Sequence, residues 1–238
     1  YEDLPMLSAA APFRAGGRAG PEHFTDVKPG GLAIKNIADL YQYPNTFRAI
    51  RISGAQLKHW LERSAGMFLQ VEAGAQDQPL LDPNFPSYHF DVIYGVMYKI
   101  NVSQPSRFTA GGILATPHAS RIQDLAYNGK PIAEDMDFIV ATNNYRASGG
   151  GGFIDPDETE IVFEAPVTNR DIVVHYIVEQ GTIVPKSDNN WSFAPLKNTT
   201  VMFETGPKAI EHLDELDGLA IEHVGDGADG FLQFRIAL

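Results

Sequence analysis

The histidines and serines of this 238-residue sequence show none of the common patterns of catalytic or metal-binding residues. There is no cysteine, and none of the seven histidines stands two or four residues from another, which are common spacings of metal-binding motifs. His59 and His175 fall on predicted amphipathic helices, where a surface or half-buried imidazole is the simpler interpretation. The Gly-x-Ser-x-Gly pattern of many serine hydrolases does not occur. We therefore predict that this chain holds neither catalytic residues nor a metal ion.

A run of four glycines, Gly149–Gly152, follows an apolar stretch at 138–142 and the polar residues 143–146. Consecutive glycines allow backbone N–H groups to approach a ligand closely, or simply allow the chain to turn. The run is not followed by Gly-Lys-Ser/Thr, and the dinucleotide-binding pattern is absent. As a bare pattern it therefore favours a structural turn, with a binding loop as the alternative.

Two tyrosines that are far apart in the sequence, Tyr43 and Tyr145, each stand where a predicted element ends in a loop. Functional side chains gather at such positions. Tyr43 is followed closely by the amide side chain of Asn45, and the pair of rings could sandwich a planar ligand. The alternative is that both tyrosines are packing residues with hydrated hydroxyl groups.

Composition and charge limit the partners of the chain. Lys and Arg number 18 and Asp and Glu 30, so the formal net charge is −12, which opposes binding to nucleic-acid polymers and to anionic membranes. Hydrophobic residues make up 44% of the chain, enough for a folded core, but no stretch has the ~18 apolar residues of a membrane-spanning helix. The opening Tyr-Glu-Asp-Leu-Pro lacks the form of a signal peptide, and we interpret the chain as a segment of a longer protein.

Hydrophobic periodicity and turn signals predict the helices and strands that hold the candidate site residues. A short buried strand precedes a Gly- and Pro-rich loop at 5–31, and Ser53 is the predicted N-cap of the clearest helix. The predicted helices are Ile34–Tyr43, Gly54–Ala65 and one capped by Thr168 or Asn169 that runs to Glu179, and the predicted strands are Phe47–Ser53, Tyr98–Val102, Ile122–Tyr127 and Phe138–Thr142. Residues 66–89 are predicted to form a loop, and Asn128-Gly129 predicts a hairpin. The fold class is therefore α+β, with a mixed, largely antiparallel sheet and packed helices.

The chain divides into a main domain at 1–195 and an appendage at 196–238. The appendage is rich in acidic residues and carries no motif that indicates chemistry. Strand signals near Thr200–Glu204 and Phe231–Ile236 flank a helix signal near Pro207–Asp217, so a small β-α-β unit is expected.

Five long and specific stretches, taken together, resemble the C-terminal domain of the bacterial 5′-nucleotidase family. The likeness is strongest to its periplasmic branch, the bifunctional 2′,3′-cyclic-nucleotide 2′-phosphodiesterase/3′-nucleotidases. It covers about 1–195, and the appendage looks like the extra tail of that branch. The matching stretches are LSAAAPFRAGGR (7–18), IADLYQYPNT (37–46), FDVIYGV (90–96), ATNNYRASGG (141–150) and DNNW (188–191).

The resemblance implies a periplasmic enzyme of two domains. An N-terminal metallophosphoesterase domain would hold two divalent metal ions, and the C-terminal domain would grip the nucleoside of a nucleotide ligand. In relatives the base lies between two aromatic rings, beside an amide, with an arginine on the small-residue loop. The corresponding substrate-binding residues here are Tyr43, Tyr145, Asn45, Arg14 or Arg18, and the glycines Gly149 and Gly150.

Two departures limit this transfer. Gly151 stands where 5′-nucleotidases usually have an Asp that can bond ribose hydroxyls, so ribose recognition must differ. The metal-binding motifs Asp-x-His, Gly-Asn-His-Glu and Gly-His-x-His are absent, so the metal ions are expected on an N-terminal domain outside this chain. We expect a substrate-recognition domain that is inactive by itself; the alternative is a non-catalytic ligand-binding or cell-surface module of the same fold.

Overall fold

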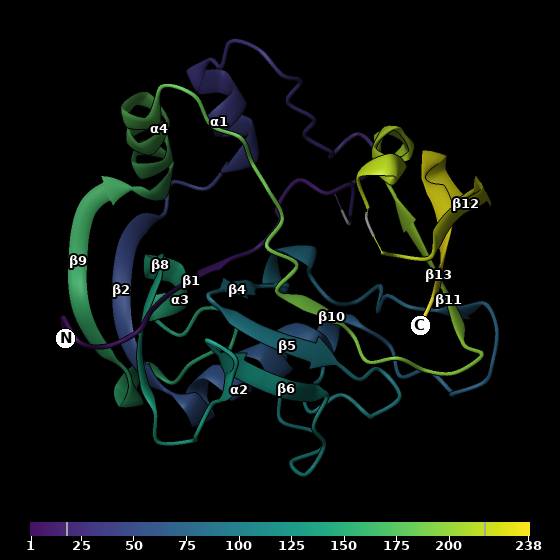
Figure 1. The fold of residues 1–238 in the computed structure, drawn as a ribbon, viewed down its shortest axis with the longest axis horizontal. Coiled ribbons are helices and arrows are strands. Elements are labelled where there is room, and N and C mark those ends of the chain that lie inside the picture. Colours follow the sequence, from purple (N-terminus) through teal and green to yellow (C-terminus); the bar gives the residue numbers. More distant parts are fainter. Residues whose placement is uncertain (18, 217) are drawn as a thin grey trace.

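The first sheet of the computed structural model contains the strands that lead to both predicted tyrosines (Figure 1). The structure describes residues 1–17, 19–216 and 218–238. In spatial order the strands of this sheet are β4 (Val92–Tyr94), β1 (Met6–Ala10), β8 (Asp137–Asn143), β2 (Thr46–Ser53) and β9 (Glu160–Thr168). β1 and β8 run parallel, and the other neighbours are antiparallel.

A second sheet and the helix α2 (Gly54–Ser64) complete the main core. The sheet has the order β10 (Trp191–Phe193), β5 (Val96–Ile100), β6 (Ile122–Tyr127) and β7 (Lys130–Pro131). Leu57, Trp60 and Leu61 lie one helical turn apart on α2 and are fully buried, and α2 contacts strands of both sheets. The predicted helix is confirmed, as is its N-cap, because Ser53 Oγ accepts the N–H of Gln56 at 3.2 Å.

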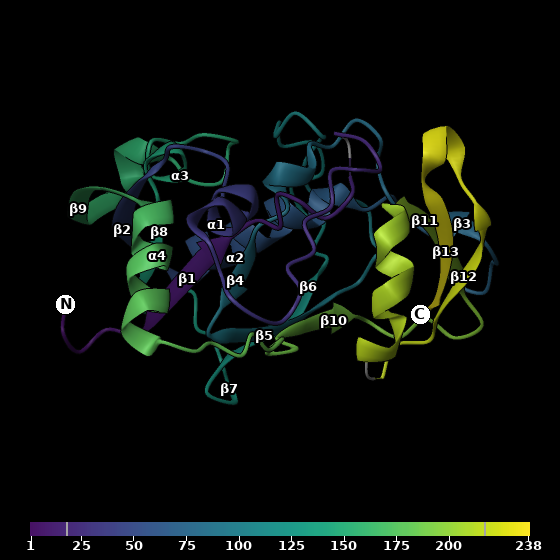
Figure 2. The same ribbon diagram turned by 90° about the horizontal axis from the view of Figure 1, so that it is seen from above.

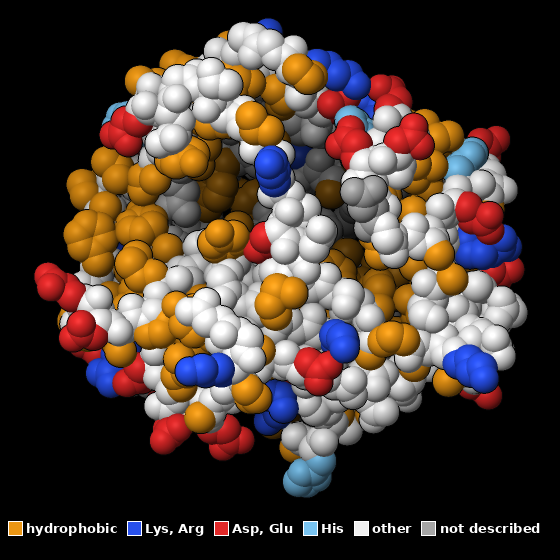
Figure 3. All heavy atoms as spheres, viewed as in Figure 1, with side chains coloured by type: hydrophobic (Ala, Val, Ile, Leu, Met, Phe, Trp, Pro, Cys, Tyr) orange, Lys and Arg blue, Asp and Glu red, His pale blue; other side chains and the backbone are white. Residues whose placement is uncertain are grey.

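Helices α1 (Ile34–Leu40) and α4 (Asn169–Gln180) pack against each other at the end of the first sheet (Figures 1 and 2). Thr168 caps α4 as predicted. Helix α1 ends three residues before the predicted Tyr43, because Tyr41 leaves helical geometry and its ring packs on Phe13. The apolar stripe predicted on α4 is not buried, and Tyr176 is 56% exposed. Apolar side chains also gather on the surface over β2 and β9 (Figure 3).

The α+β prediction with largely antiparallel pairing is confirmed. The Asn128-Gly129 hairpin joins β6 to β7, and both turn residues have positive φ. The remaining short helices are α3 (Asn144–Ala147) and the 3₁₀ helices at Ala65–Met67, Ser87–His89, Pro156–Glu158, Pro207–Glu215 and Ala228–Gly230. In the described part of the chain, no helix is long and apolar enough to cross a membrane.

The C-terminal part forms a third sheet at the far end of the molecule (Figure 2). Its order is β12 (Ile221–Asp226), β13 (Leu232–Ala237), β11 (Thr200–Thr205) and β3 (Gln78–Pro79). The predicted β-α-β pattern misses β12, whose pairing with β13 shifts register at His223/Gly225, and the helix is 3₁₀ in its described part. The end of that predicted helix, Asp217, lies outside the described residues.

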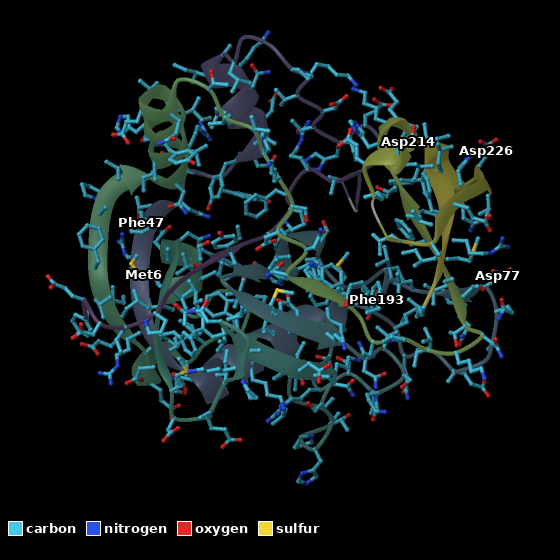
Figure 4. All side chains as sticks on the ribbon, in the orientation of Figure 1. Met6, Phe47, Asp77, Phe193, Asp214 and Asp226 are labelled. Atoms are coloured by element: carbon cyan, nitrogen blue, oxygen red, sulfur yellow. The ribbon has the colours of Figure 1, made fainter. Side chains whose placement is uncertain are left out.

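The third sheet takes one strand from the segment predicted to be a loop at 66–89. β3 pairs in parallel with β11, and Asp77 forms a bidentate ion pair with Arg235 of β13 at 2.6 and 2.9 Å. Asp77 is labelled in Figure 4 beside the C-terminal part, where Asp214 and Asp226 also lie. The boundary at 195/196 stays a prediction, and an element from the first part completes the sheet of the second.

Replacing the cap of α2 tests the helix that carries the core. Ser53→Ala removes the acceptor of the Gln56 N–H, and we expect the free energy of unfolding to fall by about 1 kcal/mol. Urea denaturation measures this change. Ser192→Ala, at an exposed position on β10, is the matched control and is expected to change stability by less than about 0.5 kcal/mol. Equal stability of the two variants would contradict a capping role.

Candidate functional site

A cavity of about 360 Å³ opens at the ends of β1 and β8. This volume is in the range of small-molecule sites, which is roughly 300–1,000 Å³. The loop after α1 contributes Tyr41, Tyr43 and Asn45, while α3 contributes Tyr145 and Arg146. The cavity therefore brings together the two predicted tyrosines and the predicted amide.

Tyr43 stands on a wall of three aromatic rings. The ring of Phe13 lies edge-on to Tyr41 and Tyr43, with centroid distances of 5.1 and 5.2 Å. Such edge-to-face pairs hold a ring at a defined angle. Phe13 therefore braces Tyr43 from the loop after β1, although sequence reasoning did not single it out.

Tyr145 is held from behind by the glycine run. The Gly150 N–H donates to the Tyr145 carbonyl oxygen at 2.8 Å, and a Cβ atom at Gly150 would lie 2.6 Å from the Tyr145 ring. Only glycine allows this approach. The His89 ring stacks on the Tyr145 ring with a centroid distance of 6.4 Å and an interplanar angle of 18°. Tyr145 remains 43% exposed. Gly149 and Gly150 are not among the residues that line the cavity, and their predicted contact with substrate stays a prediction.

Beneath the tyrosine lies a buried ion pair. Arg146 Nε donates to Asp91 Oδ2 at 2.7 Å, and Arg146 Nη2 donates to Asp91 Oδ1 at 2.9 Å. Trp60 Nε1 also donates to Asp91 Oδ2, at 2.8 Å. The remaining bonds of Arg146 go to the carbonyl oxygens of Gly150 and Tyr88. One guanidinium thus links the glycine run, Tyr88 and the core helix.

Burial, together with positive charge nearby, keeps the imidazole of His89 neutral. Burial is the largest cause that lowers the pKa of His89 to about 4, and the guanidinium groups of Arg146 and Arg63 lower it further. Arg63 Nε donates to the Gly151 carbonyl oxygen at 3.0 Å. A Cβ at Gly151 would lie 2.9 Å from Arg146 Nη1 and 3.0 Å from His89 Nε2. These groups occupy the space that an Asp side chain would need, which explains the glycine at this position.

The hydroxyl oxygen of Tyr41 accepts hydrogen bonds from two amide side chains at the cavity. Asn143 Nδ2 and Asn169 Nδ2 donate to Tyr41 Oη at 3.2 and 3.3 Å. The Asn169 N–H also donates to the carbonyl oxygen of Asn45 at 2.9 Å. These bonds connect β8, α4 and the loop after α1, so they fix the position of the loop that carries Tyr43.

Of the two predicted arginines, the structure describes Arg14. Arg14 does not line the cavity in the described part of the chain, and its Nε donates to Thr25 Oγ1 at 3.0 Å. Arg18 lies outside the described residues. Asp91 and Arg146 were missed, although both fall within the matching stretches 90–96 and 141–150. A single charged residue beside an apolar run was the signal that could have indicated a buried pair.

Within residues 1–17, 19–216 and 218–238, no group of three or more His, Cys, Asp or Glu side chains could hold a metal ion. The cavity itself offers aromatic faces, amides and one ion pair. This arrangement suits a planar, uncharged ring with polar edges.

One protein-family model and several known proteins are similar to this chain. The family model for the 5′-nucleotidase C-terminal domain matches residues 10–156. The chain is 47% identical over 230 residues to a trifunctional nucleotide phosphoesterase protein of Bacillus subtilis, covering 96% of this chain and 16% of that protein. It is 44% identical over 247 residues to a 2′,3′-cyclic-nucleotide 2′-phosphodiesterase/3′-nucleotidase of Salmonella typhimurium, covering 99% and 38%. The chain thus spans well under half the length of these relatives.

Solved structures share the fold. A putative 5′-nucleotidase of Staphylococcus aureus matches with a TM-score of 0.60 at 20% identity, covering 79% of this chain and 33% of that one. A 5′-nucleotidase precursor of Thermus thermophilus matches with a TM-score of 0.58 at 14% identity, covering 79% and 31%. Together with the family match over more than half of its length, this shows that the chain belongs to the 5′-nucleotidase C-terminal domain family.

Proposed function

We propose that this chain is the substrate-recognition domain of a 2′,3′-cyclic-nucleotide 2′-phosphodiesterase/3′-nucleotidase. The observation that carries the proposal is the meeting of Tyr43, Tyr145 and Asn45 at one cavity. The names of relatives that match over 96–99% of this chain support the choice of reaction. In this proposal the nucleoside binds in the cavity and the phosphoester projects toward a separate catalytic domain.

The rings of Tyr43 and Tyr145, which together we call the clamp, can hold a base between them only if they do not collapse onto each other. Phe13 braces Tyr43, whereas Gly150 and His89 brace Tyr145, so each ring has its own support. A base that enters between them gains stacking on both faces, and any base has such faces. The side chain of Asn45 lines the same cavity and offers a donor and an acceptor to the edge of the base.

Phosphate chemistry belongs to another part of the protein in this proposal. Two divalent metal ions on an N-terminal metallophosphoesterase domain would supply the hydroxide that attacks phosphorus. Arg14 or Arg18 is proposed to approach the phosphate from the loop after β1, because guanidinium groups bond anionic oxygens with charge assistance. The branch that the chain resembles is periplasmic, and the proposal extends to that location.

Removing either ring tests the clamp. We expect Tyr43→Ala and Tyr145→Ala each to weaken adenosine binding by roughly 1–3 kcal/mol, about 5- to 150-fold in Kd, because one stacking face is lost. Calorimetric titration gives the affinities. Tyr43→Phe and Tyr145→Phe are expected to keep most of the affinity, since the ring face does the stacking.

Tyr94→Ala is the matched control for the clamp variants, because Tyr94 is 63% exposed and lies outside the cavity. It is expected to bind adenosine like the unmodified chain. Thermal melts of all variants separate stacking from packing, since a core tyrosine would cost about 3–5 kcal/mol of stability on truncation. Unchanged adenosine affinity in folded Tyr43→Ala and Tyr145→Ala would defeat the clamp and favour a non-catalytic module.

The isolated chain is expected to lack phosphohydrolase activity. Assays with 3′-AMP and 2′,3′-cyclic AMP in the presence of Mn²⁺, Co²⁺, Mg²⁺ or Zn²⁺ should show no turnover, because the described residues hold no metal-binding cluster. The full-length Salmonella typhimurium relative is the positive control. Metal-dependent turnover that co-purifies with the chain through successive columns would sink this expectation.

The neutral imidazole behind Tyr145 makes stability depend on pH. The unfolded chain takes up a proton on His89 near pH 6.5, whereas the folded chain does so near pH 4. The stability contributed by neutral His89 is therefore complete above pH 6.5 and falls by about 1 kcal/mol per pH unit toward pH 4. Urea denaturation across this range should show a shallower fall for His89→Gln. Parallel curves for the two proteins would rule out this source of acid sensitivity.

A further inference from the structure

The most deeply placed polar groups of the cavity are those of the Asp91–Arg146 ion pair. Both residues line the cavity, yet Asp91 is only 3% exposed and Arg146 only 4%. Taking two charges out of water is costly, and an apolar pair of similar size is often as stable or more so. A buried pair is therefore weak evidence for a stabilising role, and its place at a ligand cavity directs attention to binding.

The hydrogen bonds of the pair leave specific positions open. A carboxylate has about four acceptor positions, and Asp91 uses two on Oδ2 and one on Oδ1 within the described residues. Arg146 has five N–H groups and uses four, which leaves one on Nη1. The open acceptor on Asp91 Oδ1 fits a neutral O–H donor. An anionic phosphate does not fit there, because the carboxylate would repel it.

Asp91 is the single carboxylate among the described residues that line the cavity. Apart from the guanidinium of Arg146, the other polar side-chain groups of the lining are amides and tyrosine hydroxyls. A sugar hydroxyl that reaches the inner end of the cavity therefore meets Asp91 as its charged acceptor. Hydrogen bonds to charged groups are stronger than those between neutral groups.

The proposed reaction decides which hydroxyl this is. In 2′,3′-cyclic and 3′-nucleotides the phosphoester occupies the 2′,3′ side of the ribose, and it must face the separate catalytic domain. The 5′-hydroxyl is free in both substrates and lies on the opposite side of the sugar. Resting on the proposed function, we propose that Asp91, oriented by Arg146, accepts a hydrogen bond from the 5′-hydroxyl of the nucleoside.

A series of deoxynucleosides tests this assignment without altering the protein. The unmodified chain is titrated calorimetrically with adenosine, 5′-deoxyadenosine, 2′-deoxyadenosine and 3′-deoxyadenosine. Removing the 5′-hydroxyl is expected to raise Kd by about 10-fold or more, because a bond to a charged acceptor is lost. Removal of the 2′- or 3′-hydroxyl is expected to change Kd by less than about 3-fold.

Asp91→Asn assigns the contact to the carboxylate. We expect adenosine to bind this variant no better than 5′-deoxyadenosine does, so the ratio of the two Kd values falls to about 1. Asp135→Asn, at an exposed position outside the cavity, is the matched control and should keep the ratio of the unmodified chain. Because removing one charge of a buried pair leaves the other uncompensated and destabilises a fold, a crystal structure of the unmodified chain with adenosine is the second measurement, with the 5′ oxygen expected within ~3.2 Å of Asp91 Oδ1.

The outcomes separate this inference from the proposed function. Equal affinities for adenosine and 5′-deoxyadenosine, with adenosine binding still dependent on Tyr43 and Tyr145, would overturn the 5′-hydroxyl contact and leave the clamp intact. A loss confined to the 2′- or 3′-deoxy ligand would overturn it as well. If no nucleoside binds the folded chain at all, the proposed function fails and this inference fails with it.

Discussion

The ion pair between Asp91 and Arg146 connects three parts of the chain that do not pair in one sheet or belong to one helix. They are the segment before β4, the helix α3 and the glycine run. Asp91 also accepts from Trp60 on the core helix, and its own N–H donates to Ser64 Oγ at 3.2 Å. Arg146 carries the connection onward to the carbonyl oxygens of Tyr88 and Gly150. The core helix therefore fixes the segment before β4, the helix α3 and the glycine run relative to one another. Helix α3 carries Tyr145, one aromatic ring of the cavity, and the glycine run packs against that ring.

Buried arginines fix irregular backbone elsewhere in this domain in the same way. Arg63 binds the carbonyl oxygens of Gly151 and Ala110, each at 3.0 Å. Arg121 binds those of Ala65 and Phe68, and burial lowers its pKa to about 10 although Glu62 acts in the opposite direction. A planar group with five donors can satisfy several carbonyls at once, which a sheet or helix would otherwise do. These bonds hold irregular backbone in place without a sheet or a helix.

Local patterns predicted the elements that depend on local physics. The N-cap at Ser53, the apolar face of α2 and the Asn128-Gly129 turn each act within a few residues, and the structure has all three. The strands β3, β4, β9, β10 and β12 were not predicted from the sequence. β3 has two residues and is a strand through its pairing with β11, more than a hundred positions along the chain. Element ends were also predicted less well than the elements themselves. β5 spans Val96–Ile100, two residues before the predicted 98–102, and α1 ends at Leu40, three residues before the predicted Tyr43.

The site residues show the same contrast between features set by local sequence and features set by the fold. Tyr43, Tyr145 and Asn45 stood out because motifs carried them, and the structure brings all three to one cavity. Asp91 and Arg146 are 55 residues apart in sequence, so no periodicity relates them. Phe13 likewise needed the path of the loop after β1 to reveal its contact with Tyr43.

The short strand β3 has a consequence for how this molecule behaves among its own copies. It forms the outer edge of the third sheet beside β11, and its second residue is Pro79, which has no N–H to offer. The one N–H that follows, that of Leu80, is already bonded to the Met202 carbonyl oxygen at 2.9 Å. An incoming strand would find no regular ladder of donors there, so this edge is protected against edge-to-edge aggregation. The protection is supplied by residues more than a hundred positions upstream, and a C-terminal tail transferred to another protein without them would expose β11 as an open edge.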